Sequence, residues 1–106
     1  MQRRIAGSSQ PGYKRAGVKL IEQILKTAGE NLPSGKLWKR ATHQARHYRE
    51  VELDQETYIF EYDTDKDTLD IARTGETKQR RVQRRTFDRW CTEARRRAFP
   101  DASAGR

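Results

Sequence analysis

The sequence predicts an α+β fold with two N-terminal helices, an antiparallel meander of three to four strands, and a C-terminal helix. Three changes in the spacing of apolar residues indicate this order. Apolar side chains recur every three to four residues from Gly17 to about Arg49, alternate with polar ones from Glu50 to about Arg85, and return to helical spacing after Thr86. With 106 residues the chain is long enough for one domain, which we expect over residues 17–99.

Both ends of the chain have the composition of flexible segments. Residues 1–16 combine four Lys or Arg with Gly, Ser and Pro, and offer few apolar side chains to a core. We expect a flexible basic arm there. Pro100 and the small residues after it predict a disordered tail over residues 100–106.

Two amphipathic helices are expected in the first half. The first has Val18, Ile21, Leu25 and Ala28 on one face and Gly29 as its C-terminal stop. Ser34 is a suitable N-cap for the second. The apolar stripe of the second helix is formed by Leu37, Trp38, Ala41, Ala45 and Tyr48.

The alternation of apolar and polar residues after Arg49 predicts antiparallel strands. Turn residues separate these strands at 63–67 and 74–77. The last strand, over residues 79–85, has Val82 as its one apolar residue, which is typical of an edge strand. Thr86 is a suitable N-cap for the third helix, and Asp88 would lie in its positive first turn.

Charge is sorted into three blocks along the chain, which has a formal net charge of +8. Residues 1–49 hold eleven Lys or Arg and two acids, residues 50–70 hold nine acids and one Lys, and residues 71–106 hold eleven Lys or Arg and four acids. Clustered cations bind polyanions such as nucleic acids by releasing their counterions. The two basic blocks are therefore candidate nucleic-acid contacts.

Thirteen residues form the predicted interface. Seven lie in the second helix, where no acid occurs between Lys36 and Arg49, whereas an ordinary solvated helix mixes the signs of its charges. The others lie in the strand over residues 79–85 and at the start of the third helix; a strand would put Arg81 and Arg85 on one face and Arg84 on the other. The full set is Lys36, Lys39, Arg40, His43, Arg46, His47, Arg49, Arg80, Arg81, Gln83, Arg84, Arg85 and Arg89.

A structural role for some of these residues is the alternative. The second helix would then present a solvated basic face, and Glu61 and Asp70 on neighbouring strands would form cross-strand ion pairs with the arginines of the last strand.

Two helices followed by a strand hairpin, over about residues 17–85, resemble the layout of winged helix-turn-helix proteins, although those normally have three helices before the wing. The resemblance implies that the second helix enters the major groove and that the hairpin lies on the DNA backbone. We therefore expect a regulatory or mobile-element factor that binds double-stranded DNA in the cytoplasm, at the nucleoid. RNA as the ligand, and a homodimer as the binding species, stay open.

Two other functions fit parts of the sequence. Residues 58–82 resemble the second half of a RelE-type ribonuclease toxin, and the resemblance implies that Arg73 and Arg81 stabilise the transition state of RNA cleavage. An adaptor that binds an acidic protein through its basic arm and helices is the third class. The balance of the sequence favours a binding protein over an enzyme, and no catalytic residue is predicted.

No cofactor or metal is predicted. The Asp63-x-Asp65-x-Asp67 run has Thr68 where a calcium loop needs Gly, and His43 and His47 lack the glutamate of the zinc-protease motif. Cys91 is the only cysteine and lies on an apolar stripe, so we expect it in the core. The sequence shows no signal peptide and no apolar run of membrane-spanning length, which predicts a protein that does not bind membranes.

Overall fold

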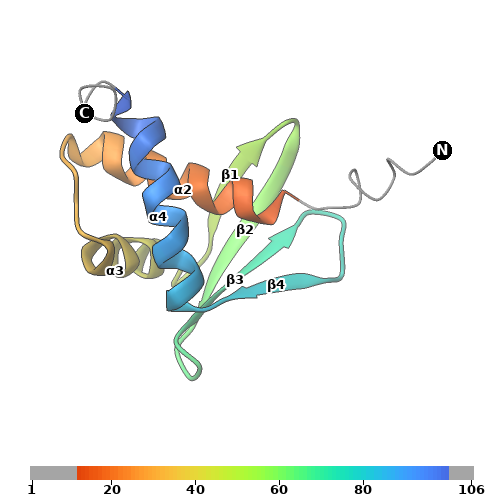
Figure 1. Cartoon of the computed structure of the whole chain (residues 1–106). Coiled ribbons are helices and arrows are strands. Elements are labelled where there is room, and N and C mark those ends of the chain that lie inside the picture. Colours follow the sequence, from red (N-terminus) through yellow and green to blue (C-terminus); the bar gives the residue numbers. More distant parts are fainter. Residues whose placement is uncertain (1–11, 101–106) are drawn as a thin grey trace.

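The computed structural model describes residues 12–100 and confirms the predicted order of helices and strands (Figure 1). Its elements are α2 (Tyr13–Ala28), α3 (Ser34–Gln44), β1 (Arg49–Leu53), β2 (Glu56–Asp63), β3 (Thr68–Arg73), β4 (Gln79–Val82) and α4 (Arg84–Ala98). The four strands form one antiparallel meander in the order β1-β2-β3-β4. No helix among these residues is long and apolar enough to cross a bilayer.

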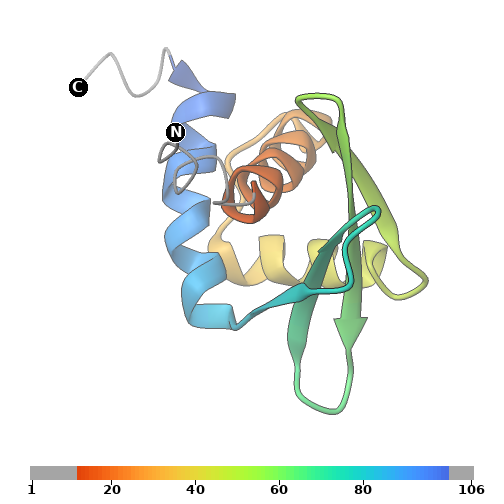
Figure 2. The same ribbon diagram turned by 90° about the vertical axis from the view of Figure 1, so that its right-hand side faces the viewer.

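The three helices lie on one side of the twisted sheet, as Figures 1 and 2 together show. Side chains alternate between the two faces of a strand, and six apolar side chains on the face toward the helices are buried. These residues are Val51, Tyr58, Phe60, Leu69, Ile71 and Val82. The fold is therefore a two-layer structure, with a helix layer over one sheet face and no helix of the described part over the other.

The helix layer is held together by close contact between α2 and α4. Gly17 of α2 lies so near Trp90 of α4 that a β-carbon at position 17 would overlap the indole ring. Trp90 is 5 % exposed, so the ring has little room to move. A glycine in the middle of a helix loses stability relative to alanine, and here it permits the two helices to approach.

Contacts between α3 and α4 complete the layer. Trp38 and Phe87 pack edge to face with ring centroids 5.1 Å apart. The guanidinium group of Arg95 donates to the side chain of Asn31, to the carbonyl of Leu32 and to the hydroxyl of Ser34, at 2.9–3.1 Å. Arg95 thus fixes the loop between α2 and α3 to the last turns of α4.

The starts of the first two helices differ from the prediction, and the end of the first agrees with it. α2 begins at Tyr13 and buries Ala16, so the predicted arm over residues 1–16 is too long; residues 1–11 and 101–106 lie outside the described part of the chain. Ser34 is the first helical residue of α3, with Pro33 at the N-cap, and its hydroxyl accepts from Arg95 instead of capping. Gly29 ends α2 in the left-handed conformation, as predicted, with φ 71°.

The second helix is shorter than predicted and the third is longer. α3 ends at Gln44, because the carbonyl of Ala45 accepts the backbone N–H of Tyr62 on β2 at 3.0 Å. Tyr48 therefore lies beyond the helix and is exposed, which corrects its predicted place on the buried stripe. α4 begins at Arg84, so Thr86 is not the cap and Asp88 is not in the first turn.

Candidate nucleic-acid interface

Four of the predicted contact residues form one face of α3. Lys36, Lys39, Arg40 and His43 lie at i, i+3, i+4 and i+7, the spacing that places side chains on a single helix face. All four are exposed, and none makes an ion pair or side-chain hydrogen bond with another described residue. We call this set the α3 basic face.

Packing of the opposite side fixes the direction of the α3 basic face. Leu37, Trp38 and Ala41 are each at most 4 % exposed and point into the core. α3 contains no acidic residue, so no i, i+4 ion pair supports it, and burial of its apolar stripe holds it in place. Four cationic or titratable side chains are thereby displayed to solvent without local neutralisation.

A second row of cations runs along α4. Arg85, Arg89 and Arg96 lie at i, i+4 and i+11, which is one face of a helix, and all are exposed with no ion pair to a described residue. We call these three residues the α4 arginine row. Glu93 is the acidic residue in the last two turns of α4. Its carboxylate is bound by Arg97 at 3.2 Å and by Lys14 at 3.4 Å.

Arg96 is a member that the sequence analysis missed. A run of three arginines at a helix C-terminus suits the negative end of the helix dipole, which explains these residues without any ligand. The sequence signal for Arg96 is its spacing of seven residues from Arg89. Seven residues make about two helical turns, so the two side chains lie on the same helix face.

The side chain of Arg84, the first residue of α4, reaches the first turn of α3. The guanidinium group of Arg84 lies beside Gly35, where a β-carbon at position 35 would be 3.2 Å from its Nη2. Neither α3 nor α4 has an acidic residue in its first turn or a side-chain cap. Arginines beside the positive ends of helix dipoles destabilise the protein, and they create a local environment that attracts anions.

Arg84 and Arg85 reach this region because they belong to α4. The prediction that they alternate on the last strand is wrong, since β4 ends at Val82 and Gln83 occupies the N-cap position of α4. Arg80 remains on β4, where its guanidinium carbon lies 5.8 Å from the ring centroid of Trp90.

Arg49 and Arg81 are bound within the protein. Arg49 begins β1 and donates to the side chains of Gln44 and Gln23 and to the carbonyl of Glu50. Arg81 lies 3.3 Å from Asp70 and 3.8 Å from Asp63. The predicted ion pair between the last strand and Asp70 is confirmed, and Asp63, not Glu61, is the second partner.

Arg46 and His47 lie in the turn between α3 and β1, and both are exposed. They follow α3 directly in the chain, although they are not helical as predicted. His47 lies beyond the end of α3, so His43 and His47 do not share a helix face, and residues 12–100 contain no cluster of three or more His, Cys, Asp or Glu that would hold a metal ion.

The open face of the sheet has the opposite sign. Five carboxylates on β1, β2 and β3 have side chains that point away from the helices, by the pairing register of the strands. They are Glu50, Glu52, Glu61, Asp63 and Asp70, and we call them the acidic sheet face. Arg81 of β4 pairs with Asp70 of β3, so its positively charged side chain lies on the acidic sheet face.

The two arginines implied by the ribonuclease resemblance do not converge. Arg73 pairs with Tyr58 in the register and faces the helices, whereas Arg81 pairs with Asp70 and faces away from them. Arg73 is also held by Glu76 at 2.8 Å and by Glu56 at 3.8 Å, and the hydrogen bond to Glu76 raises the pKa of its guanidinium. The two guanidinium groups do not form a single phosphate clamp.

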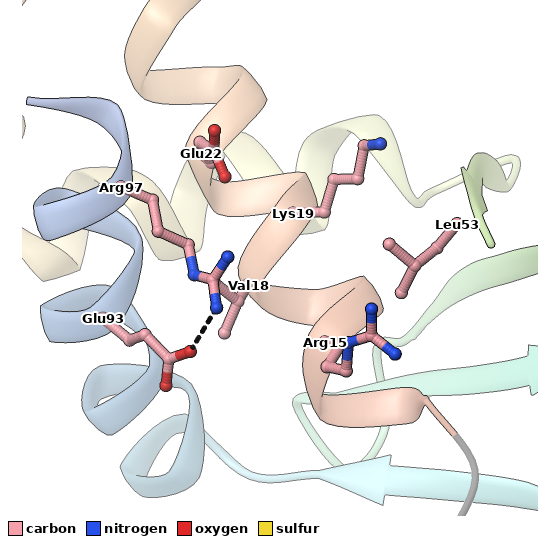
Figure 3. A pocket seen from close by; sticks show the side chains of 7 residues that line it. All are labelled: Arg15, Val18, Lys19, Glu22, Leu53, Glu93 and Arg97. Carbon is pink, nitrogen blue, oxygen red and sulfur yellow. Dashed lines mark hydrogen bonds and ion pairs between the residues drawn. The ribbon is translucent and has the colours of Figure 1, made fainter.

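A hollow of about 190 Å³ lies between α2, α4 and the end of β1 (Figure 3). Its charged lining is largely paired: Arg15 binds Asp54 at 2.6 Å beside the hollow, and Glu93 binds Arg97 across one side. Burial works against ionisation of Glu93, but hydrogen bonds from Arg97 and Lys14 outweigh it and lower the pKa of this carboxyl group. Ion pairs thus involve most of the charged side chains that line the hollow, and Lys19 is the charged lining residue without an ion pair to a described residue.

Comparison with protein-family models, with curated proteins and with solved structures finds no match to this chain.

Proposed function

We propose that the protein binds double-stranded DNA through the α3 basic face and the start of α4. The observation that carries this proposal is the α3 basic face itself, because all four side chains of one helix surface are cationic or titratable, exposed and unpaired within the described residues. A protein without a polyanionic ligand loses stability from such an arrangement, since like charges one turn apart repel.

The two helices would make different kinds of contact. α3 would lie in the major groove, where the exposed side chains of Arg40 and His43 would form hydrogen bonds with base edges. Arg84, Arg85 and Arg89 lie at the start of α4, where a helix N-terminus favours phosphate. In this arrangement α3 reads sequence and α4 positions the protein, as a regulatory or mobile-element factor of the nucleoid would require.

A pair of charge-matched variants tests the proposal. Changing Lys36, Lys39 and Arg40 to Gln removes three charges from the α3 basic face. Changing Lys14, Arg15 and Lys26 to Gln removes three charges from α2, where each has an ion-pair partner. Both variants lower the net charge equally, and loss of the exposed ion pairs on α2 costs little stability.

Each lost phosphate contact should weaken binding to a short duplex by about tenfold at about 0.1 M salt and reduce the log–log salt slope by about 0.9. The α3 variant should lose affinity accordingly, while the α2 variant should stay close to the wild type. Equal losses in the two variants would mean that net charge, not this surface, governs binding.

Assays with RNA and duplex DNA also distinguish the proposed function from the ribonuclease and adaptor alternatives. A ribonuclease would degrade labelled RNA, and Arg73→Ala would abolish the cleavage. An adaptor for an acidic protein would bind neither duplex DNA nor RNA with the steep salt dependence of counterion release.

A further inference from the structure

Tyr48 is the one large hydrophobic side chain that the structure exposes among residues 12–100. It is 56 % exposed, forms no aromatic pair and makes no hydrogen bond with a described residue. Every other Tyr, Trp and Phe of this part of the chain is buried or half-buried. An exposed aromatic ring loses the stabilisation that burial would give, so its position calls for a physical reason.

The backbone of Tyr48 is strained as well as exposed. Its φ of 139° lies in a region that glycine adopts readily and that a β-carbon disfavours. Such conformations persist where the surrounding structure holds them, and they concentrate at functional sites.

Contacts on both sides hold the residue in place. The carbonyl of Ala45 accepts from the backbone N–H of Tyr62, and the guanidinium group of Arg49 binds Gln44, Gln23 and the carbonyl of Glu50. Tyr48 lies between these two anchors. The backbone that carries the ring is therefore held on both sides, which reduces the backbone entropy that binding a ligand would have to remove.

Basic side chains precede Tyr48 in the chain, on the side of α3. Arg46 and His47 precede it, both exposed, and His43 ends the α3 basic face just before this turn. In the β2–β3 turn, Asp67 accepts a hydrogen bond of 2.6 Å from the hydroxyl of Tyr62. An exposed aromatic ring next to basic side chains is a combination that binds unpaired nucleobases, because the basic groups hold the phosphates while the base stacks on the ring.

We propose that Tyr48 is a stacking platform for an unpaired base next to the duplex that α3 contacts. This inference rests on the proposed function, and it narrows the ligand to DNA that has a single-stranded or flipped base beside a duplex. The phenol ring would stack on the base, and Arg46 and His47 would bind the phosphates on either side of it.

Two DNA probes test the inference: a short duplex with blunt ends, and the same duplex with a single-stranded overhang that carries 2-aminopurine. The wild type should bind the overhang probe more tightly and quench its fluorescence. Tyr48→Ala should weaken binding to the overhang probe by about tenfold, leave the blunt duplex nearly unchanged, and remove the quenching. Tyr48→Phe keeps the ring and should keep the preference.

Tyr48→Gly separates binding from folding. Glycine relieves the strain at a φ of 139°, so this variant should melt no lower than Tyr48→Ala while it loses the overhang preference in the same way. If Tyr48→Ala and the wild type bind both probes alike while the blunt duplex still binds through α3, the stacking role is wrong and the proposed function stands. If the wild type binds neither probe, both are wrong.

Discussion

The helix layer and the open face of the sheet use their charges in opposite ways. On the helix layer, the α3 basic face and the α4 arginine row leave seven cationic or titratable side chains without an ion-pair partner among the described residues. On the sheet, Arg81 is bound by Asp63 and Asp70 within the acidic sheet face. The helix layer therefore has exposed positive charge available for a ligand, whereas the acidic sheet face carries an excess of negative charge.

This separation has a consequence for association. A polyanion is attracted by the helix layer and repelled by the acidic sheet face, so the protein approaches it in a preferred orientation. The net charge of +8 does not reveal this property, because it sums the two faces. The orientation depends on the packing of α2, α3 and α4 over a single sheet face.

The largest effect is expected where that packing is tightest. Gly17→Ala places a methyl group against the buried ring of Trp90 and should lower the free energy of unfolding by about 1–3 kcal/mol, less the gain of up to about 1 kcal/mol from better helix propensity. Urea denaturation followed by circular dichroism measures the change.

Gly35→Ala is the matched control in the same layer. The added methyl group meets the end of the flexible Arg84 side chain, which moves easily, so the variant should be unchanged or more stable by up to about 1 kcal/mol. Equal destabilisation of both variants would mean that α2 and α4 are not in the close contact described here.

A smaller effect sharpens the comparison between the two faces. Arg84→Ala should weaken binding to all duplexes alike, by about tenfold at about 0.1 M salt, and reduce the salt slope by about one. Arg81→Ala removes the same charge from the acidic sheet face and should leave affinity within about twofold. Filter binding at several salt concentrations distinguishes them, and a larger loss for Arg81→Ala would place the ligand on the sheet.

The smallest effect concerns the ion pairs that join α2 and α4. The pKa of Glu93 is lowered in the folded protein, so its contribution to stability is present above the pKa of an unfolded glutamate and is lost as the pH falls through the folded value. Glu93→Gln should therefore reduce stability near neutral pH by less than about 1 kcal/mol and make no difference in strong acid. Thermal melts from neutral to acidic pH measure this; a constant difference at every pH would assign the loss to packing instead.

Element order and the core could be predicted because the spacing of apolar residues differs clearly between helices and strands. Val51, Phe60 and Ile71 alternate with polar neighbours, and Leu37 and Ala41 recur at helical spacing. The pairing of Arg81 with Asp70 was also accessible, since consecutive strands of a meander lie side by side.

The boundaries around the basic residues could not be predicted in the same way. Between Val82 and Phe87 no apolar residue marks the change from strand to helix, so Arg84 and Arg85 fit either pattern. Tyr48 follows Ala45 at helical spacing, yet α3 ends before it, where the carbonyl of Ala45 accepts the backbone N–H of Tyr62 in a contact that depends on the tertiary fold. Local sequence does not encode such long-range competition.

Backbone amide chemical shifts, followed while a short DNA duplex is added to the full chain, test the central claim most directly. We expect the shift changes to cluster on residues 36–43 of α3 and 84–89 of α4, with little change at Glu50, Glu52 and Glu61, and a weaker response to single-stranded RNA. Shift changes centred on the acidic sheet face, or spread evenly over the molecule, would contradict the proposal that the helix layer forms the binding surface.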